Sequence, residues 1–285
     1  MKTGFWSEPD DDATSTLKPV GGDSAPRQTT GTGALAFLAT SDAEVMIARC
    51  PGVAKLLPEI ATALDRQTAD APGILFDLSV LTDEERLLVT EVFGEGEVAA
   101  TVALPDGVVA EIGESVFPGL WRVRFVGVDN RLVADYAEVS AIPQAIRRAA
   151  GMTLPRLEIG DLPEGIMNAP PVLSEIAERA VNHRPGSPNH VISLTLLPML
   201  PEDIDLIVDR LGNGPVKIVS RGYGTCRIQA TAIHKVWSVQ FFNVMDAILL
   251  DTIEIGVVPS VAQAAEDDFR DAAVRLREIE EAYFR

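Results

Sequence analysis

The stretch LWRVRFVG at residues 120–127 returns as VWSVQFFN at residues 236–243, with its tryptophan, a valine and a phenylalanine in register. In both copies apolar residues alternate with other residues, and a period of two predicts a β-strand. A phrase of this kind that recurs far along the chain is typical of a structural unit that occurs twice.

The likeness continues on both sides of these strands. LLPEIATALD (56–65) matches VLSEIAERAV (172–181), FGEGEV (93–98) matches LGNGPV (211–216), and LVADYAEVSAIP (132–143) matches ILLDTIEIGVVP (248–259). Identical pairs are Glu59 and Glu175, Gly96 and Gly214, Trp121 and Trp237, Phe125 and Phe241, Asp135 and Asp251, Glu138 and Glu254, and Pro143 and Pro259. The spacing is 116 residues except near FGEGEV, where it is 118, and loops tolerate such differences. We interpret the chain as an internal duplication.

Each copy predicts the same order of elements. A helix (about 53–66 or 169–182) with apolar residues at helical spacing precedes a short apolar strand and a second helix. Alternating runs rich in Val, Ile, Phe and Trp then predict strands joined by tight turns. The expected fold is α+β: two tandem repeats, each helix–strand–helix followed by an antiparallel β-meander and a helix, related by an approximate two-fold axis.

Helix boundaries are marked by capping residues. Thr82 and Glu85 predict a capping box in the first copy, and Pro201 suits the first position of the matching helix. Gly94 and Gly212 are suited to end these helices. Ser260 and Gln263 predict a capping box for the C-terminal helix, whose apolar stripe is Phe269, Ala272, Leu276, Ile279 and Tyr283.

These patterns divide the chain into four parts. Residues 1–33 are rich in Asp, Gly, Pro, Ser and Thr and predict a flexible acidic tail. The first repeat is expected over 34–150, a linker over 151–165 and the second repeat over 166–285.

Composition restricts the classes of partner. The chain has 47% hydrophobic and 23% charged residues, as packed globular proteins do, and a formal net charge of −18. Such a charge opposes nucleic acid and anionic membranes as partners, since both are bound through basic surfaces. It is compatible with a basic peptide or a basic protein surface.

Cellular location is predicted from cysteine content and hydropathy. Two cysteines, Cys50 and Cys226, are too few for a disulfide framework, which fits a reducing cytoplasm. The N-terminal sequence lacks the apolar core of a signal peptide. The apolar run AILLDTIEIGVV is too short to span a bilayer and contains two acidic residues, so we expect no membrane insertion.

Catalytic and metal sites are weakly indicated. His183, His190 and His234 lie in the second copy with Cys226, but without the close ligand spacing of a zinc site. Two cysteines cannot by themselves hold an iron–sulfur cluster, so we expect no metal and no cofactor. Cys226 and His234 could form a nucleophilic pair on neighbouring strands, which is the basis of an enzymatic alternative.

The stretch RGYGTCRI at 221–228 precedes the second tryptophan strand and has no counterpart before the first. Its glycines fit a turn that requires positive φ. Tyr and Arg often anchor protein interfaces, so an interaction loop is an equally good interpretation. The tryptophans recur in both copies and are expected in the core. Recurrence likewise favours structural roles for Asp251 and Glu254, as solvated strand residues or turn acceptors.

Several blocks in the second copy, in this order, resemble the HupH/HyaF/HoxQ family of hydrogenase expression/formation proteins: MNAPPVLSEI, LTLLPMLPEDIDLI, LGNGPVKIVSRGYGTCRI, VWSVQFFN, DTIEIGVVP and AAEDDFRDAAVRLREIE. The resemblance covers about residues 165–285 and extends more loosely over the first copy. Thr225 and Ser238 depart from the family pattern, in which an asparagine and a second aromatic residue are usual. Carried over by position, the candidate partner-binding residues are Arg221, Gly222, Tyr223, Gly224, Cys226, Arg227, Trp237 and Asn243.

The resemblance implies a non-enzymatic, cytoplasmic accessory protein for uptake [NiFe]-hydrogenases. Its expected partners are the iron–sulfur small-subunit precursor, before twin-arginine export, and other hydrogenase accessory proteins. A cysteine-dependent enzyme using Cys226 is one alternative, and a self-associating scaffold without a specific client is another.

Overall fold

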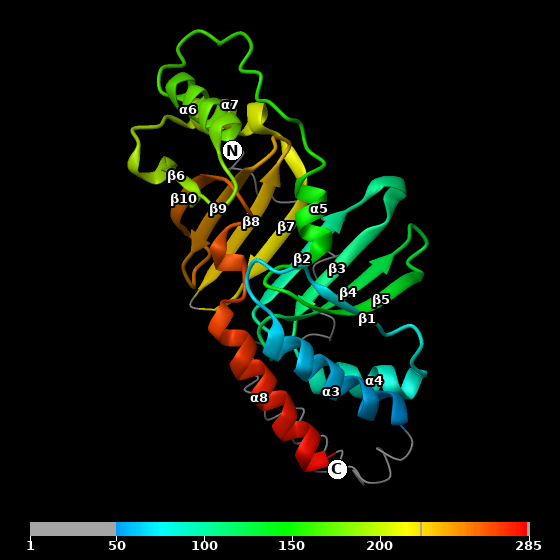
Figure 1. Ribbon diagram of the computed structural model, residues 1–285. Coiled ribbons are helices and arrows are strands. Elements are labelled where there is room, and N and C mark those ends of the chain that lie inside the picture. The colour runs from blue at the N-terminus through cyan, green and yellow to red at the C-terminus, as the bar shows by residue number, and fades with distance from the viewer. Residues whose placement is uncertain (1–49, 223, 284–285) are drawn as a thin grey trace. The chain divides into compact units, whose positions relative to one another are not determined.

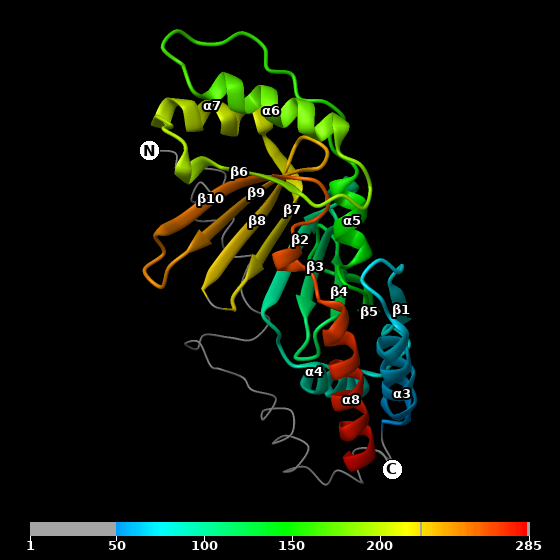
Figure 2. The same ribbon diagram turned by 60° about the vertical axis from the view of Figure 1, so that its left-hand side comes forward.

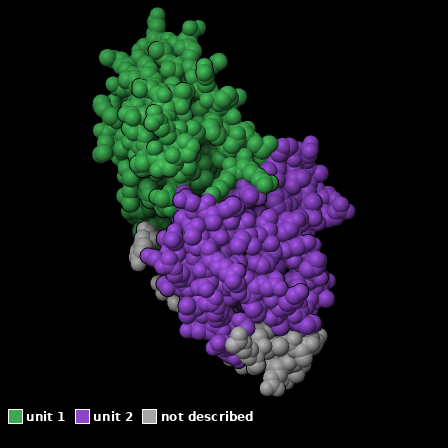
Figure 3. Space-filling view, viewed as in Figure 1, with its two compact units in different colours: residues 1–24, 101–103, 146–261 green, residues 25–100, 104–145, 262–285 purple. Residues whose placement is uncertain are grey.

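The computed structural model describes residues 50–222 and 224–283 of the chain. The chain forms two compact units, coloured separately in Figure 3. Of the described residues, unit 1 contains 101–103, 146–222 and 224–261, and unit 2 contains 50–100, 104–145 and 262–283. The predicted repeats at 34–150 and 166–285 and the linker at 151–165 stay predictions, and the bounds of the compact units differ from them. The predicted tail at 1–33 lies outside the described residues.

Helices and strands follow one another in the order that the sequence predicts (Figure 1). From residue 50 to 150 the elements are α3 (Pro51–Arg66), β1 (Ile74–Asp77), α4 (Asp83–Phe93), β2 (Val98–Ala103), η2 (Pro105–Gly107), β3 (Val109–Glu114), β4 (Leu120–Val126), β5 (Leu132–Val139) and α5 (Gln144–Ala150). From 151 to 283 they are α6 (Ala169–Asn182), β6 (His190–Ser193), η3 (Leu194–Leu196), α7 (Pro201–Leu211), β7 (Asn213–Ser220), β8 (Thr225–Thr231), β9 (Val236–Phe242), β10 (Ile248–Ile255), η4 (Ser260–Ala262) and α8 (Glu266–Tyr283).

We call residues 50–150 the first stretch and residues 151–283 the second stretch. Their strands follow corresponding orders. In the first stretch the order is β1-β5-β4-β3-β2, and in the second it is β6-β10-β9-β8-β7. The neighbouring strands β1–β5, β5–β4 and β4–β3 pair antiparallel, as do β6–β10, β10–β9, β9–β8 and β8–β7. The α+β class with antiparallel meanders is therefore confirmed. Superposition of the two stretches about a two-fold axis stays a prediction.

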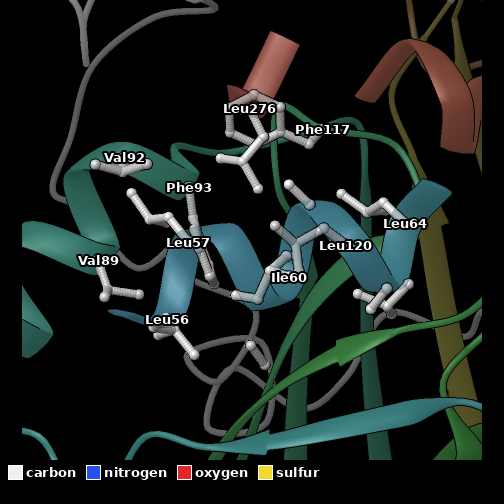
Figure 4. Packing of buried hydrophobic residues seen from close by; sticks show 14 of the residues in the cluster. Leu56, Leu57, Ile60, Leu64, Val89, Val92, Phe93, Phe117, Leu120 and Leu276 are labelled. Carbon is white, nitrogen blue, oxygen red and sulfur yellow. The ribbon is translucent and has the colours of Figure 1, made fainter. Parts of the chain in front are cut away.

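The C-terminal helix α8 completes the core of unit 2 rather than that of the repeat that precedes it. It runs alongside α3 (Figures 1 and 2). Phe269, Ala272 and Leu276 are fully buried, and Ile279 packs against the same cluster, as the predicted stripe requires. Figure 4 shows Leu276 beside Phe117 and above Phe93, with α3 beneath. Burial of this stripe is the main stabilising contribution of α8.

A second apolar cluster lies in unit 1. It joins the buried faces of α6 and α7 to strand residues, among them Val236, Ile253 and Ile255. Val236 and Ile255 are directly opposite each other in the register of β9 and β10. Because side chains alternate along a strand, residues 238, 240, 251 and 253 lie on the same sheet face as this cluster.

Most of the predicted helix boundaries are confirmed. The Thr82 hydroxyl accepts the Glu85 backbone N–H at 3.3 Å, which completes the expected capping box. Gly94 and Gly212 follow their helices with φ of 57° and 59°. The predicted box at Ser260 is wrong: these residues form a 3₁₀ turn, and α8 begins at Glu266.

A buried carboxylate joins two helix starts in each stretch. Glu85 accepts the backbone N–H of Gly52 at 2.6 Å and that of Thr82 at 2.9 Å. At the matching position, Asp203 accepts backbone N–H groups from the start of α6 and from Leu200, the residue before α7. Hydrogen bonds to a carboxylate favour its charged form, and the pKa of Glu85 is lowered, chiefly by the Thr82 backbone N–H.

Candidate functional site

The loop between β7 and β8 is open to solvent. Arg221, Gly222 and Gly224 are exposed, and Tyr223 lies outside the described residues. Gly224 has φ of 123°, where residues with a Cβ are strained, and an added Cβ would lie 3.2 Å from the carbonyl oxygen of Phe242. The turn interpretation is thus supported at Gly224, and the exposed loop is also available for contact.

The turn between β9 and β10 carries two apolar side chains into solvent. Asn243 shapes this turn, because its Oδ1 accepts the backbone N–H of Met245 at 2.9 Å and that of Ala247 at 3.0 Å. Val244 is 99% exposed and Met245 is 81% exposed. Asn243 therefore acts through the backbone, and the residues that it presents are its neighbours.

These two turns lie at the same end of the sheet. Thr225 at the start of β8 is paired with Phe242 at the end of β9. The Arg227 guanidinium donates to Asp246 Oδ1 at 3.0 Å and lies 4.2 Å from the centre of the Phe242 ring. Arg227 thus links the β8 strand to the second turn. We call Arg221, Gly222, Gly224, Val244 and Met245 the hairpin-end surface.

Sequence reasoning missed Val244 and Met245. The signal was present, because NVMDA at 243–247 places two adjacent apolar residues between strands, where polar turn residues are usual. In the first stretch the matching turn has Val128, also exposed, but a polar Asp129 where Met245 stands.

Two predicted contact residues are buried, which corrects their assignment. Cys226 and Trp237 lie in the core of the sheet and offer almost no surface to a partner. Burial raises the pKa of the Cys226 thiol to about 12, with a smaller contribution from the charge of Glu254. The two side chains can therefore support the hairpin-end surface from behind but cannot contact a client there.

The proposed Cys226–His234 pair is not formed. Cys226 is the second residue of β8, whereas His234 comes three residues after that strand ends. At about 3.3 Å per residue the five steps from Cys226 to the end of β8 alone span roughly 17 Å. His234 Nδ1 instead lies 3.3 Å from the carbonyl oxygen of Ala150.

The histidines do not converge. His190 Nε2 lies 2.7 Å from Glu175 Oε1, and the backbone carbonyl of His183 accepts the Lys235 ammonium at 3.1 Å. Among residues 50–222 and 224–283, no group of three His, Cys, Asp or Glu side chains is arranged to hold a metal ion.

The recurring acidic residues are less solvated than the sequence suggests. Asp135 and Glu138 are buried, and their matches Asp251 and Glu254 are partly buried. Glu138 accepts the backbone N–H of Gln144 at 2.8 Å, next to the start of α5. Asp251 and Glu254, expected as solvated strand residues or turn acceptors, are thus only partly solvated, and the structural role expected from their recurrence is supported at Glu138.

Within the part of the chain that the structure describes, no helix is both long enough and apolar enough to cross a bilayer.

Comparisons with known proteins agree with the order of motifs. The model of the HupH hydrogenase expression protein C-terminal conserved region matches residues 51–153 and 166–283. Hydrogenase expression/formation protein HupH of Rhizobium leguminosarum bv. viciae is 51% identical over 286 residues, covering 100% of both chains. Hydrogenase expression/formation protein HoxQ of Cupriavidus necator is 43% identical over 226 residues, which are 79% of each chain. Hydrogenase-1 operon protein HyaF of Escherichia coli is 34% identical over 236 residues, 81% of each.

A solved structure is also similar in sequence. Hydrogenase expression protein HupH from Thiobacillus denitrificans is 29% identical, and the match covers 40% of this chain and 94% of that chain with a TM-score of 0.36. Matches to the family model over most of the described residues, and a relative that aligns from end to end, lead to one conclusion. The chain belongs to the HupH family of hydrogenase expression proteins.

Proposed function

We propose that this chain is a non-catalytic, cytoplasmic accessory protein that binds the iron–sulfur small-subunit precursor of an uptake [NiFe]-hydrogenase before its export. The relatives named for hydrogenase expression and formation support a role in hydrogenase maturation. Contact with other hydrogenase accessory proteins is part of the same proposal. The client would be held on the hairpin-end surface.

One observation carries this assignment. Val244 and Met245 are almost fully exposed beside a loop that contains Arg221 and Tyr223 in the sequence. Neither apolar side chain contributes to the core, and together they add adjacent apolar area to the hairpin-end surface. Their turn is held by Asn243 and by the Arg227–Asp246 link, and a rigid turn loses less entropy on binding.

The expected affinity suits a transient complex. Tyr and Arg anchors at a surface of this kind typically contribute about 2 kcal/mol or more each, and a small interface gives moderate rather than permanent binding. A net charge of −18 would speed the approach of a basic client surface. The client can thus be held and later released.

The cysteine-dependent enzyme is the weaker alternative. Cys226 is buried, its pKa is raised to about 12, and His234 is not beside it. A nucleophilic cysteine needs the opposite: a lowered pKa, an adjacent base and access to substrate.

A pull-down of the small-subunit precursor with purified variants tests the proposal. The double variant Val244→Ser with Met245→Ser should keep its folded structure, because both side chains are exposed. It should retain at least roughly tenfold less precursor than wild type. Arg221→Ala with Tyr223→Ala should have a similar effect.

Val128→Ser is the matched control, since it changes an exposed valine at the same turn of the first stretch. Wild-type retention by both double variants would remove the hairpin-end surface from the proposal. Sedimentation of each variant separates the scaffold alternative, in which loss of Val244 and Met245 would dissolve a self-associated species and leave the precursor unbound in every sample.

A further inference from the structure

In the first stretch the buried carboxylate of Asp135 forms an ion pair with Arg122. Arg122 donates from Nη2 to Asp135 Oδ2 at 2.8 Å and from Nε to Asp135 Oδ1 at 3.1 Å, a two-point contact. The same guanidinium donates to the hydroxyl of Thr90. Asp135 is 1% exposed, and its charge is balanced by a cation from the neighbouring strand.

The second stretch keeps the carboxylate but not the cation. Asp251 matches Asp135, and its cross-strand neighbour is Gln240, just as the neighbour of Asp135 is Arg124. Counting from the matched tryptophans, the residue at the position of Arg122 is Ser238. Gln240 Nε2 donates to Asp251 Oδ2 at 2.9 Å, but Asp251 Oδ1 is buried and has no partner among the described residues.

Three further buried atoms on the same face of the sheet also lack a partner among the described residues. Gln229 Oε1, Ser238 Oγ and Gln240 Oε1 are also buried without a hydrogen bond to any described residue. Gln229 is paired across the sheet with Ser238, and Gln240 with Asp251, so the four side chains form two adjacent rows on one face. Gln229, Ser238 and Gln240 are 0%, 0% and 1% exposed. We call these four residues the acceptor cluster.

The acceptor cluster is suited to a ligand that is cationic and donates hydrogen bonds. When Asp251 is ionised, three of the four atoms without a partner can only accept hydrogen bonds, and the fourth, a hydroxyl, can also accept. Burial raises the pKa of Asp251, an effect that the Gln240 amide offsets only in part. Water would satisfy hydrogen bonds but would not balance the charge. A guanidinium has a positive charge and five N–H donors in one plane.

The neighbouring cations are directed elsewhere. Arg227 is opposite Gln240 in the register, but its guanidinium contacts Asp246 and the Phe242 ring. Lys217 is opposite Gln229 and is exposed. A cation for Asp251 is therefore expected from outside these strands.

We propose that the acceptor cluster binds the guanidinium of an arginine side chain supplied by a partner polypeptide, in the way that Arg122 binds Asp135 within the first stretch. The arginine would enter beside Asp251, the one member of the acceptor cluster that is partly exposed. Gln240 is two residues from the end of β9, where the turn with Val244 and Met245 begins. This inference rests on the proposed function for the identity of the partner but not for the chemistry of the site. The acidic net charge favours such a partner.

The test uses the full chain and the pentapeptide acetyl-Gly-Leu-Arg-Leu-Gly-amide. Binding is followed by the NMR signals of the Gln229 and Gln240 side-chain amides. The peptide should shift both signals, and a peptide with neutral citrulline in place of arginine should bind roughly tenfold or more weakly. Asp251→Asn keeps the side-chain shape and should weaken the arginine peptide to the same degree. Asp271 is an exposed residue of α8, so Asp271→Asn removes the same charge far from the cluster in the sequence and should have no effect on peptide binding.

Ser238→Arg offers the site its own cation. This variant should fold, melt at a higher temperature and no longer bind the peptide. Failure to fold would show that the cluster has no room for a guanidinium and would overturn the proposal. Equal binding of arginine and citrulline peptides, unchanged binding to Asp251→Asn, or absence of binding would also overturn it. Free L-arginine binding as tightly as the peptide would assign the cluster to a small molecule instead.

The failures of the two proposals are distinguishable. Precursor binding that Ser238→Arg and Asp251→Asn leave unchanged would show that the precursor does not supply the arginine, and it leaves the accessory role intact. Peptide binding without any precursor binding refutes the choice of client and leaves the arginine site intact.

Discussion

Replacement of Asp203 by alanine should destabilise unit 1 far more than an ordinary surface change. The carboxylate of Asp203 is buried and accepts three backbone N–H groups: Asn168 at 3.0 Å, Ala169 at 2.9 Å and Leu200 at 3.1 Å. Two of these donors belong to the start of α6 and one precedes α7, so a single side chain holds both helix starts together. Asp203→Ala removes every one of these acceptors at once.

The expected magnitude follows from the number of donors left unpaired. An unpaired buried donor costs about 1–3 kcal/mol, and bonds to a charged acceptor lie toward the upper part of that range. Water will reach some of the freed N–H groups at the helix starts. We therefore expect the free energy of unfolding to fall by about 3–5 kcal/mol, which is exceptional for a single substitution. Asp203→Asn should lose less, because its amide oxygen can still accept.

Urea denaturation followed by circular dichroism measures this loss. Glu202→Ala is the matched control, since Glu202 occupies the same first turn of α7 but is exposed. If Asp203→Ala and Glu202→Ala unfold at the same urea concentration, the carboxylate does not hold the helix starts and the reasoning is refuted. Unequal midpoints with equal slopes would attribute the difference to stability alone.

The pH dependence gives an independent check. Burial alone would raise the pKa of Asp203, but its backbone N–H donors outweigh burial and lower it below the ordinary 3.8. A carboxyl whose pKa is lower in the folded chain stabilises that chain above pH 3.8, and this contribution disappears as the pH falls through the folded pKa. Wild type should therefore lose stability in acid more steeply than Asp203→Asn. Parallel curves would contradict the assignment.

Three further predictions concern other buried groups. Burial raises the pKa of Glu114 to about 7, so the folded chain loses stability as the pH rises from 4.5 through 7. Glu114→Gln should therefore unfold at a higher urea concentration than wild type at pH 8, and at a similar concentration near pH 4.5. Equal urea midpoints at pH 8 would count against this prediction. The pKa of the Cys226 thiol is about 12 rather than 9.0, so the thiolate fraction at Cys226 should be on the order of a thousandfold smaller than in a free cysteine. Rapid alkylation of Cys226 in the native chain would contradict that environment. Gly119 has φ of +82°, and an added Cβ would lie 2.3 Å from the Phe269 ring. Gly119→Ala should therefore lower the melting temperature by several degrees, whereas Gly113→Ala should not, because an added Cβ at Gly113 has nothing within 4 Å. Equal melting temperatures of the two variants would refute the contact.

Local sequence signals predicted local structure well. The Thr82–Glu85 box and the glycines after α4 and α7 act through neighbours in the chain, so their geometry is readable from spacing. The stripe on α8 was equally clear, but periodicity shows which face is apolar and not what covers it. Its packing against α3 of unit 2 depends on residues more than 200 positions earlier in the chain, and no local pattern encodes that choice.

The candidate site was predicted only in part for a related reason. Arg221, Gly222 and Gly224 were found because an unmatched stretch stands out against a repeated one. Resemblance to a family marked Cys226 and Trp237 as well, but it does not separate residues that contact a partner from residues that support the fold. Burial makes that separation. Val244 and Met245 were missed, although two adjacent apolar residues between strands were a signal for exposure.

Comparison of matched positions gives information that neither copy gives alone. A buried aspartate with an arginine at its side is an ordinary structural ion pair, and a buried aspartate without one would by itself suggest only a raised pKa. Asp135 and Asp251 have the same register, yet Arg122 has been replaced by Ser238 and Arg124 by Gln240. An unbalanced carboxylate destabilises a fold, and selection for stability alone would favour a neutral residue at position 251. Its presence beside the exposed Val244 and Met245 turn is therefore better explained by binding than by folding. The same comparison directs the experiments to the second stretch and supplies the first as their control.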